Sequence, residues 1–476
     1  MATMMLEIPD ALKGMVPALE AVVAEARAQL ESGRTGGPVD YEAFERRLRE
    51  KVAAVERDVH GAALSALVID APKVLINGVL HARVGRHETT YMTQAGGVVV
   101  ARPLYRPAGQ RNARVVDPIS LRVGMIEDVW LPGAARGMAH LLQQGTSREA
   151  EATAHQLGRL PYSRSSFERV GHAVGKQYVG QHQQVEHKLI EAFEVPREAH
   201  GISVSLDRVS VPMEEPRPRP VGRPRKDAPE RPVSRVYRMA YCGTVTLHDA
   251  EGEALHTIRY GTMPNGDPKT LCLGMADDVV ALRAQRPDLH VSLLCDGAVE
   301  MWKLLDAEFD AATFDATTTT IHRRLDFWHV IEKLGAAARV IFGESEASKN
   351  VARWKISLLN RRAARADILA ELVASGKEEN DEDDPVHGAI TYLTNNADRM
   401  DYAGARKLGL PIGSGNVEAT CKSLVTIRMK RAGARWKTDT GEHIIHLRAL
   451  ALSDRWEDAM NIMLRASQVT FRRVAA

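Results

Sequence analysis

The feature that most constrains the fold is the order of strand and helix patterns between residues 202 and 326. Three stretches alternate apolar and polar residues as antiparallel strands do, and a turn sequence at 249–252 joins the second to the third. Helical patterns then alternate with two further strand patterns. The expected strands cover 202–207, 242–247, 255–260, 289–295 and 318–325, and the expected helices cover 276–285 and 302–309. This order predicts an RNase H-like α/β core, in which helices flank a mixed five-stranded sheet.

Three acidic residues fall where such a core brings distant segments together. Asp207 lies in the first strand, Asp296 follows the fourth strand, and Glu418 begins a helix after a Gly-Ser-Gly turn at 413–415. In this fold the first and fourth strands are neighbours and the last helix packs beside them. Phosphodiester hydrolysis and transfer need carboxylates from different segments that share divalent ions. Each acid alone is equally compatible with a structural role, and Asp249 in the hairpin turn is the alternative for the first.

The segment that follows Glu418 is strongly basic. Six Lys and Arg residues face one acid between 413 and 437, whereas the net charge of the whole chain is only +2. Affinity for nucleic acid therefore has to come from local patches such as this one, which is expected to continue as a basic helix. We expect Trp436 either to stack on a splayed base or to pack in the core. The residues expected to hold phosphates are Lys422, Arg428, Lys430, Arg431, Arg435 and Lys437.

The N-terminal part carries the outline of a second DNA-binding element. A capping-box sequence at Thr146 starts a helix that ends at Gly158, and Ser163 can cap the next helix. That second helix begins with the polar and basic residues Ser163, Arg164 and Arg169, as a helix-turn-helix reader does. An ordinary helical hairpin is the alternative.

A proline-rich basic insert at 212–235 follows the first core strand. Its Arg223, Arg225 and Lys226 stand in an extended sequence that suits an arm in the DNA minor groove. Short basic proline-rich segments are also common as plain linkers.

These patterns divide the chain into six parts. We expect helices over 1–60, a small β-containing domain over 61–145, helix-turn-helix-like DNA-binding helices over 146–200, the first part of the core over 201–331, an all-helical insertion over 332–408, and the last part of the core with C-terminal helices over 409–476.

The cysteine content and the apolar runs of the sequence indicate the cellular compartment of the protein. The four cysteines form no CxxC pair, which argues against a zinc ribbon or a disulfide framework and favours a reducing cytoplasm. The N-terminus has no signal-peptide pattern, and no run reaches the roughly 18 apolar residues of a membrane span. The sequence therefore predicts a soluble intracellular protein.

Several motifs together resemble one family. They are Leu294-Cys295-Asp296-Gly297 with Trp302, Leu325-Asp326-Phe327-Trp328-His329, the stretch from Gly409 to Glu418, and the stretch from Tyr162 to Phe167. Over about residues 70 to 460 the chain resembles bacterial insertion-sequence transposases of the ISKra group, which are similar to the wider Mutator-like DDE transposases. The sequence departs from that pattern at Arg208, where the family usually has glycine after the first aspartate.

The resemblance implies a catalytic, metal-binding triad of Asp207, Asp296 and Glu418 with two Mg²⁺ ions, for which Mn²⁺ would substitute. It also implies that Asp326 and His329 form an accessory D-x-x-H motif; as alternatives, Asp326 caps a helix and His329 packs as a polar residue. The implied activity is cleavage and strand transfer of double-stranded DNA, at transposon inverted-repeat ends and at the target.

The implied protein is a homodimer or higher oligomer on DNA, in the bacterial cytoplasm and associated with the nucleoid when bound. Two other classes remain open, an RNase H-like nuclease or resolvase and a transposase-derived DNA-binding regulator.

Overall fold

The computed structural model describes residues 7–34, 36–214, 236–310, 320–377 and 384–474. The chain forms two compact units. The first unit contains residues Met1–Gln181 and Glu457–Ala476, and the second contains His182–Trp456. The basic residues Arg223, Arg225 and Lys226 lie outside the described residues.

The first unit combines helices with a small antiparallel sheet of order β3-β2-β1-β9. Its strands are β1 (Lys73–Ile76), β2 (Val79–Thr93), β3 (Gly96–Pro107) and β9 (Phe471–Arg473), so the C-terminal segment completes a sheet begun near the N-terminus. Its helices are η1 (Asp10–Met15), α1 (Val16–Gly33), α2 (Tyr41–Ala66), α3 (Pro118–Val123), α4 (Pro132–Gln144), α5 (Ser147–Leu157) and α6 (Arg164–Gly180). The helix α18 (Trp456–Ala466) begins at the last residue of the second unit.

The capping box expected at Thr146 is confirmed. Its hydroxyl accepts the Glu149 N–H, the Glu149 carboxylate accepts the Thr146 N–H, and α5 ends at Gly158 in the left-handed conformation (φ 64°) that glycine tolerates best. The two helices of the expected helix-turn-helix are thus present, while their use in reading DNA stays a prediction.

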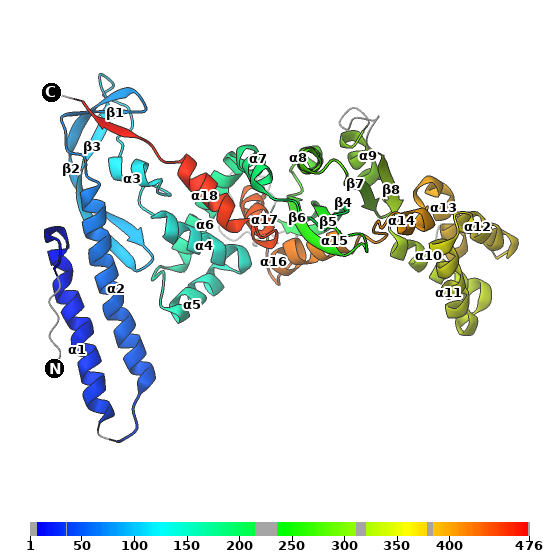
Figure 1. Cartoon of the computed structure of the whole chain (residues 1–476), viewed down its shortest axis with the longest axis horizontal. Coiled ribbons are helices and arrows are strands. Elements are labelled where there is room, and N and C mark those ends of the chain that lie inside the picture. Colours follow the sequence, from blue (N-terminus) through cyan, green and yellow to red (C-terminus); the bar gives the residue numbers. More distant parts are fainter. Residues whose placement is uncertain (1–6, 35, 215–235, 311–319, 378–383, 475–476) are drawn as a thin grey trace, which may run out of the picture. The chain divides into compact units, whose positions relative to one another are not determined.

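The second unit contains the mixed five-stranded sheet that the sequence predicts. The order is β6-β5-β4-β7-β8, with β4, β5 and β6 antiparallel and β4, β7 and β8 parallel (Figure 1). The strands are β4 (Gly201–Met213), β5 (Val236–His248), β6 (Ala254–Thr262), β7 (His290–Cys295) and β8 (Ile321–Leu325). This order is consistent with an RNase H-like core.

Helices cover both faces of this sheet (Figure 1). On one face, α8 (Pro268–Gln285) and α9 (Val299–Glu308) pack with the inward side chains of the strands in the main hydrophobic cluster. Val204, Leu293 and Met275 are fully buried in this cluster. On the other face α15 (Gly415–Thr420) packs against β4 and β5, and α17 (Thr438–Leu452) packs against β6. The helix α7 (His182–Ala192) contacts α8.

Five helices between β8 and α15 form a separate hydrophobic cluster. They are α10 (Phe327–Phe342), α11 (Glu344–Asn360), α12 (Ala364–Ala374), α13 (Pro385–Asn395) and α14 (Tyr402–Lys407), and the short turn η2 (Ala397–Arg399) links the last two. The helix α10 begins directly after β8, because Asp326 between them caps it. These helices therefore start at the same sheet edge as the acids discussed below.

The expected continuous basic helix after Glu418 is not what the structure shows. The helix α15 is followed by a π-helical segment, η3 (Cys421–Thr426), and by the single turn α16 (Ile427–Met429), after which the chain continues in turns. The helix ends there because Trp436 pairs with the end of β4, where its N–H donates to Pro212 O at 3.0 Å. Gly433 (φ 78°) helps the chain reverse before that pairing.

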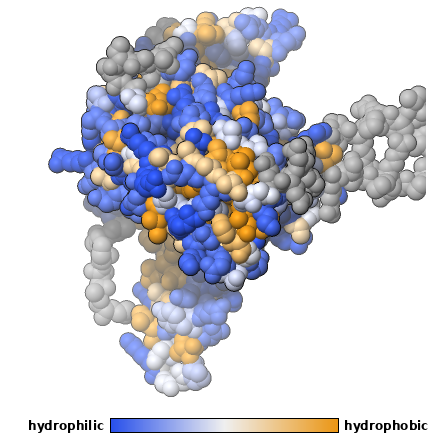
Figure 2. Space-filling view, turned by 90° about the vertical axis from the view of Figure 1, so that its right-hand side faces the viewer, coloured by the Kyte–Doolittle hydropathy of each residue, from blue (hydrophilic) through white to orange (hydrophobic). Residues whose placement is uncertain are grey.

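Hydrophilic side chains dominate the face shown in Figure 2, and hydrophobic residues interrupt them in small groups. Among the described residues, no helix combines the length and the apolar character that a membrane crossing requires.

Candidate metal centre beside the end of strand β7

The three predicted acids line one small cavity. It has a volume of about 130 Å³ and receives side chains from β4, from the residue after β7, from α10 and from α15. The residues around it are Leu206, Asp207, Asp296, His329, Ser414, Val417 and Glu418. The structure thus brings Asp207, Asp296 and Glu418 together with His329 at one place on the sheet.

Asp207 points away from the main hydrophobic cluster, as strand alternation requires, because Leu206 points into it. One carboxylate oxygen accepts the N–H of Arg208 at 2.6 Å, and the other accepts the Sγ–H of Cys421 at 3.4 Å. The Arg208 side chain turns away to pair with Glu300. Arg208, which stands where the family usually has glycine, therefore does not block the Asp207 carboxylate from lining the cavity.

Two cysteines accompany Asp207. Cys242 is its partner in the β4–β5 register, and Cys421 follows Glu418 by three residues. The hydrogen bond with Cys242 most of all, then burial and the charge of Asp207, raise the pKa of the Cys421 thiol far above its ordinary value. Cys421 is consequently a neutral hydrogen-bond donor beside the acid.

Asp296 is held by the turn that it forms after β7. Its carboxylate accepts the Ala298 N–H at 2.9 Å, and its carbonyl accepts the Trp302 indole N–H at 2.7 Å. The group that comes close to Gly297 is the ring of Tyr392 on α13, which a Cβ at position 297 would overlap. The absence of a side chain at position 297 thus lets α13 pack against this turn.

Asp326 is fully buried and connects two segments of the site. One of its oxygens accepts the His329 N–H at 2.9 Å, which caps α10. The other accepts both the backbone N–H and the hydroxyl of Ser414, the latter at 2.8 Å. The turn that begins the helix of Glu418 is thereby fixed to the end of β8. Asp326 thus caps α10, while its accessory role at a metal stays a prediction.

The most compact set of possible metal ligands is Asp326, His329 and Glu418. Their ligand atoms lie within 4.8 Å of one another, and no other group of three or more such residues meets this criterion in the described parts of the chain. His329 Nδ1 lies 3.1 Å from an Asp326 oxygen and 3.8 Å from a Glu418 oxygen. Asp207 and Asp296 border the same cavity but lie outside this set.

The donor set fits a divalent cation. His329 Nδ1 is buried and makes no hydrogen bond within the described structure, despite its short distance to Asp326. A buried polar atom without a hydrogen bond is unfavourable unless a bound ion or water interacts with it. Carboxylate oxygens suit Mg²⁺ and Mn²⁺, and an imidazole nitrogen suits transition metals. In the sequence, the only signal for His329 is the spacing Asp-x-x-His.

The basic residues after Glu418 separate into exposed and buried ones. Arg428 is 6% exposed and lies over the Trp436 ring at 4.9 Å, and Trp436 is 8% exposed and donates its indole N–H to Met429 O at 3.0 Å. The core-packing alternative for Trp436 therefore describes the structure, since a base cannot stack on a covered ring. Exposed side chains remain at Lys422, Lys430, Arg431, Arg435 and Lys437.

The remaining predicted residues fall in both units, Ser163, Arg164 and Arg169 in the first and Asp249 in the second. Ser163 occupies the N-cap position of α6, and its hydroxyl is within hydrogen-bond distance of Ser165 and Ser166. Arg164 is exposed and Arg169 pairs with Glu127 at 3.2 Å. Asp249 accepts the N–H groups of Glu251 and Glu253, so it stabilises the β5–β6 turn.

Comparisons with known proteins give a likeness to solved structures and none in sequence. No protein-family model matches the chain, and no curated protein matches it. Among solved structures, the chain is similar to the Drosophila P element transposase strand transfer complex, at 12% sequence identity and a TM-score of 0.25 over 70% of this chain and 80% of that one.

Proposed function

We propose that this chain is a DDE-type DNA transposase of the ISKra group, which binds the ends of an insertion sequence and catalyses metal-dependent DNA strand cleavage and strand transfer. The observation that carries the proposal is the cavity that Asp207, Asp296, Glu418 and His329 share beside the end of β7. Phosphoryl transfer on DNA requires divalent ions held by carboxylates that converge from different segments.

Asp207, Asp296 and Glu418 would hold two Mg²⁺ ions, or Mn²⁺ in their place, with His329 and Asp326 as further ligands. Bound there, the ions would activate the oxygen nucleophile and stabilise charge on the leaving oxygen. The chain itself positions the acids. Asp326 fixes Ser414 and hence the helix of Glu418, while the β7 turn fixes Asp296.

Contacts with double-stranded DNA would come from the basic segment that follows Glu418. The Lys430 ammonium donates to the Ser210 hydroxyl at 3.2 Å, so this cation contacts β4, the strand that carries Asp207. Phosphate contacts by such residues position DNA without reading its sequence. Ser163, Arg164 and Arg169 at the start of α6 would add sequence-dependent contacts with the inverted-repeat ends.

Helices α10 to α14 would form the all-helical insertion of this transposase. Transposition joins two ends to one target, so the active form would be a homodimer or a larger oligomer on DNA, in the bacterial cytoplasm and at the nucleoid.

The test uses DNA that carries the sequences flanking the coding region, incubated with Mg²⁺ or Mn²⁺ and protein. The wild type should cut at the ends and join the 3′-hydroxyls to target DNA. Asp296→Asn and Glu418→Gln should lose both steps but keep DNA binding, while Glu344→Gln, which changes an 86% exposed acid on α11, should keep all activities.

The same assay separates the alternatives. Cleavage of branched or unrelated DNA without end preference would instead indicate a nuclease or resolvase. End binding without metal-dependent turnover would indicate a DNA-binding regulator.

A further inference from the structure

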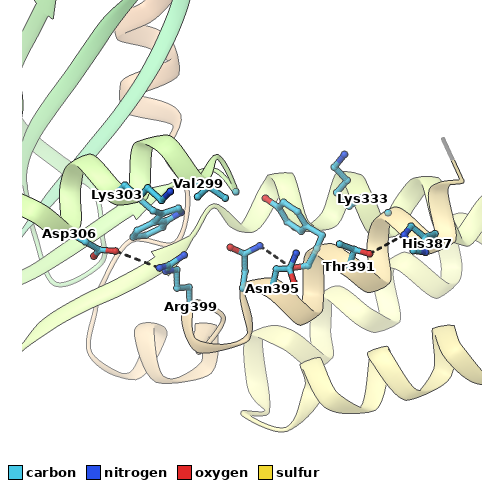
Figure 3. A pocket seen from close by; sticks show the side chains of 13 residues that line it. Val299, Lys303, Asp306, Lys333, His387, Thr391, Asn395 and Arg399 are labelled. Atoms are coloured by element: carbon cyan, nitrogen blue, oxygen red, sulfur yellow. Dashed lines mark hydrogen bonds and ion pairs between the residues drawn. The ribbon is translucent and has the colours of Figure 1, made fainter. Parts of the chain in front are cut away.

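A second and larger cavity opens between α9 and α13, next to the metal centre. Its volume is about 630 Å³, which is within the usual range for small-molecule sites. Figure 3 shows its walls, with Lys303, Asp306 and Arg399 toward one end and Lys333, Thr391 and His387 toward the other. None of the residues singled out as catalytic or DNA-binding lines it.

The cavity is positively charged. Asp306 is its one acidic lining residue, and its carboxylate pairs with Arg323 at 2.6 Å and lies 3.6 Å from Arg399. Lys303 and Lys333 are exposed and form no ion pair with any described residue. Two ammonium groups without counter-charge, together with Arg399, favour an anionic ligand.

One wall of the cavity combines planar side-chain groups with hydrogen-bonding groups. The Arg399 guanidinium lies 4.2 Å from the Trp302 ring centroid, and its Nε is buried without a hydrogen bond in the described structure. The amide of Asn395 is exposed on the same side, and Thr391 adds a hydroxyl. A ligand that carries both a phosphate and a hydrogen-bonding ring would meet partners for each part.

The cavity is joined to the metal centre through the turn after β7. Gly297 lines the cavity directly and follows Asp296, and Trp302 donates its indole N–H to the Asp296 carbonyl at 2.7 Å. The Tyr392 ring contacts Gly297, so α13 is fixed against the same turn. A DNA strand whose phosphate reaches Asp296 would therefore pass the mouth of this cavity.

We infer that the cavity between α9 and α13 is a nucleoside-phosphate site, in which Lys303, Lys333 and Arg399 hold the phosphate and Asn395 and Thr391 contact the base or sugar. The occupant is one nucleotide unit of the DNA strand beside the cleaved bond, and in this respect the inference rests on the proposed function. A free mononucleotide has the same chemistry, and the experiment distinguishes the two sources.

The experiment measures binding of a fluorescein-labelled, 12-nucleotide single-stranded DNA by anisotropy in EDTA, where the metal centre cannot contribute. Lys303→Gln with Lys333→Gln should weaken binding about tenfold and flatten the salt dependence of log K by roughly 0.7, the value for one phosphate contact on a single strand. The matched control, Lys349→Gln with Lys407→Gln, changes two exposed lysines on α11 and α14 and should leave affinity within about twofold of wild type.

Unlabelled dTMP and inorganic phosphate serve as competitors. If dTMP displaces the oligonucleotide only at concentrations far above the oligonucleotide dissociation constant, the occupant is a unit of the strand. If dTMP instead raises the melting temperature of wild type but not of the lysine variant, and oligonucleotide affinity is the same in both, the site takes a free nucleotide. The inference would be overturned if the wild type and the lysine variant bind the oligonucleotide with equal affinity and dTMP changes the melting temperature of neither.

Failure of the proposed function would look different. Glu418→Gln should bind the oligonucleotide as the wild type does, because binding in EDTA does not involve the acids. If the wild type cuts no DNA, but the substitution of Lys303 and Lys333 still weakens oligonucleotide binding, the nucleoside-phosphate site stands and the transposase proposal fails.

Discussion

Asp326 accepts hydrogen bonds from both the backbone N–H and the hydroxyl of Ser414, 88 residues later in the chain. The acid is fully buried, and its other oxygen caps α10. A buried carboxylate with this many donors fixes the chain around it. Asp326 therefore joins β8, α10 and the turn before Glu418, alongside the backbone hydrogen bond that Phe327 N–H donates to Ile412 O at 2.9 Å.

Replacement of Asp326 should destabilise the second unit more than replacement of its partner. Asp326→Ala leaves three donors without an acceptor and should lower the free energy of unfolding by about 3 kcal/mol, whereas Ser414→Ala loses one hydrogen bond and should lower it by about 1 kcal/mol. Urea denaturation measures both values. Asp398→Ala, which alters a 70% exposed acid, is the control. Equal losses of unfolding free energy in Asp326→Ala and Ser414→Ala would contradict the role of Asp326 as the acceptor that joins these segments.

The contact between Gly297 and Tyr392 should appear as coupling between two substitutions. Gly297→Ala introduces a Cβ that overlaps the Tyr392 ring, and overpacking of this kind costs about 1–3 kcal/mol. In a Tyr392→Ala background the same change should cost much less. A double-mutant cycle on unfolding free energies measures the difference, and strictly additive effects would show that the ring does not press on this turn.

The exposed cations of the segment after Glu418 should determine the salt dependence of DNA binding. Lys430→Ala with Arg435→Ala removes two candidate phosphate contacts, so the slope of log K against log salt should fall by about 1.8 for double-stranded DNA. Filter binding at several salt concentrations provides the slope. Arg339→Ala with Lys349→Ala removes two cations from α10 and α11 and should leave it unchanged. If the slope is unaltered in Lys430→Ala with Arg435→Ala, these two residues do not contact DNA phosphates.

Stability should depend on pH through Asp278 on α8. Burial raises the pKa of Asp278 to about 6, although Arg455 at 3.7 Å and the Tyr260 hydroxyl oppose the shift. Because the folded pKa lies above the unfolded value of about 3.9, folding favours the protonated form. The stability that this form contributes is complete below about pH 4 and is lost as pH rises through about 6.

The comparison with Asp278→Asn isolates this effect, because the variant stays neutral. Between pH 4 and 7, the wild type should lose on the order of 3 kcal/mol of unfolding free energy relative to the variant. Urea denaturation across this range tests the sign. A difference that is constant with pH would mean that Asp278 titrates alike in the folded and unfolded chains.

The sheet could be predicted because strand alternation is a local signal. The predicted stretches at 202–207, 242–247 and 255–260 each lie inside an observed strand, and the parallel strands β7 and β8 follow in the expected order. Strand lengths were underestimated, since β4 and β5 extend beyond their alternating parts as a long antiparallel ladder. Pairing with a neighbour extends a strand where its own sequence gives no signal.

The site was less predictable, because it depends on contacts between distant segments. The three acids could be proposed from their positions in the first strand, after the fourth strand and at the start of a helix, but sequence spacing does not say which ligand atoms come closest. His329 faces Glu418 because Asp326 caps α10 and binds Ser414 at the same time. The helix after Glu418 similarly ends early because Trp436 pairs with β4, a contact that helical periodicity does not contain.

The most direct test of the metal centre is a titration of the protein with Mn²⁺, in which electron paramagnetic resonance measures the free ion. We expect wild type and the exposed-acid control Glu344→Gln to bind Mn²⁺ alike, and Glu418→Gln and His329→Ala to bind at least about tenfold more weakly, as loss of a ligand does elsewhere. Equal Mn²⁺ affinity in all four proteins would contradict a metal centre at this cavity.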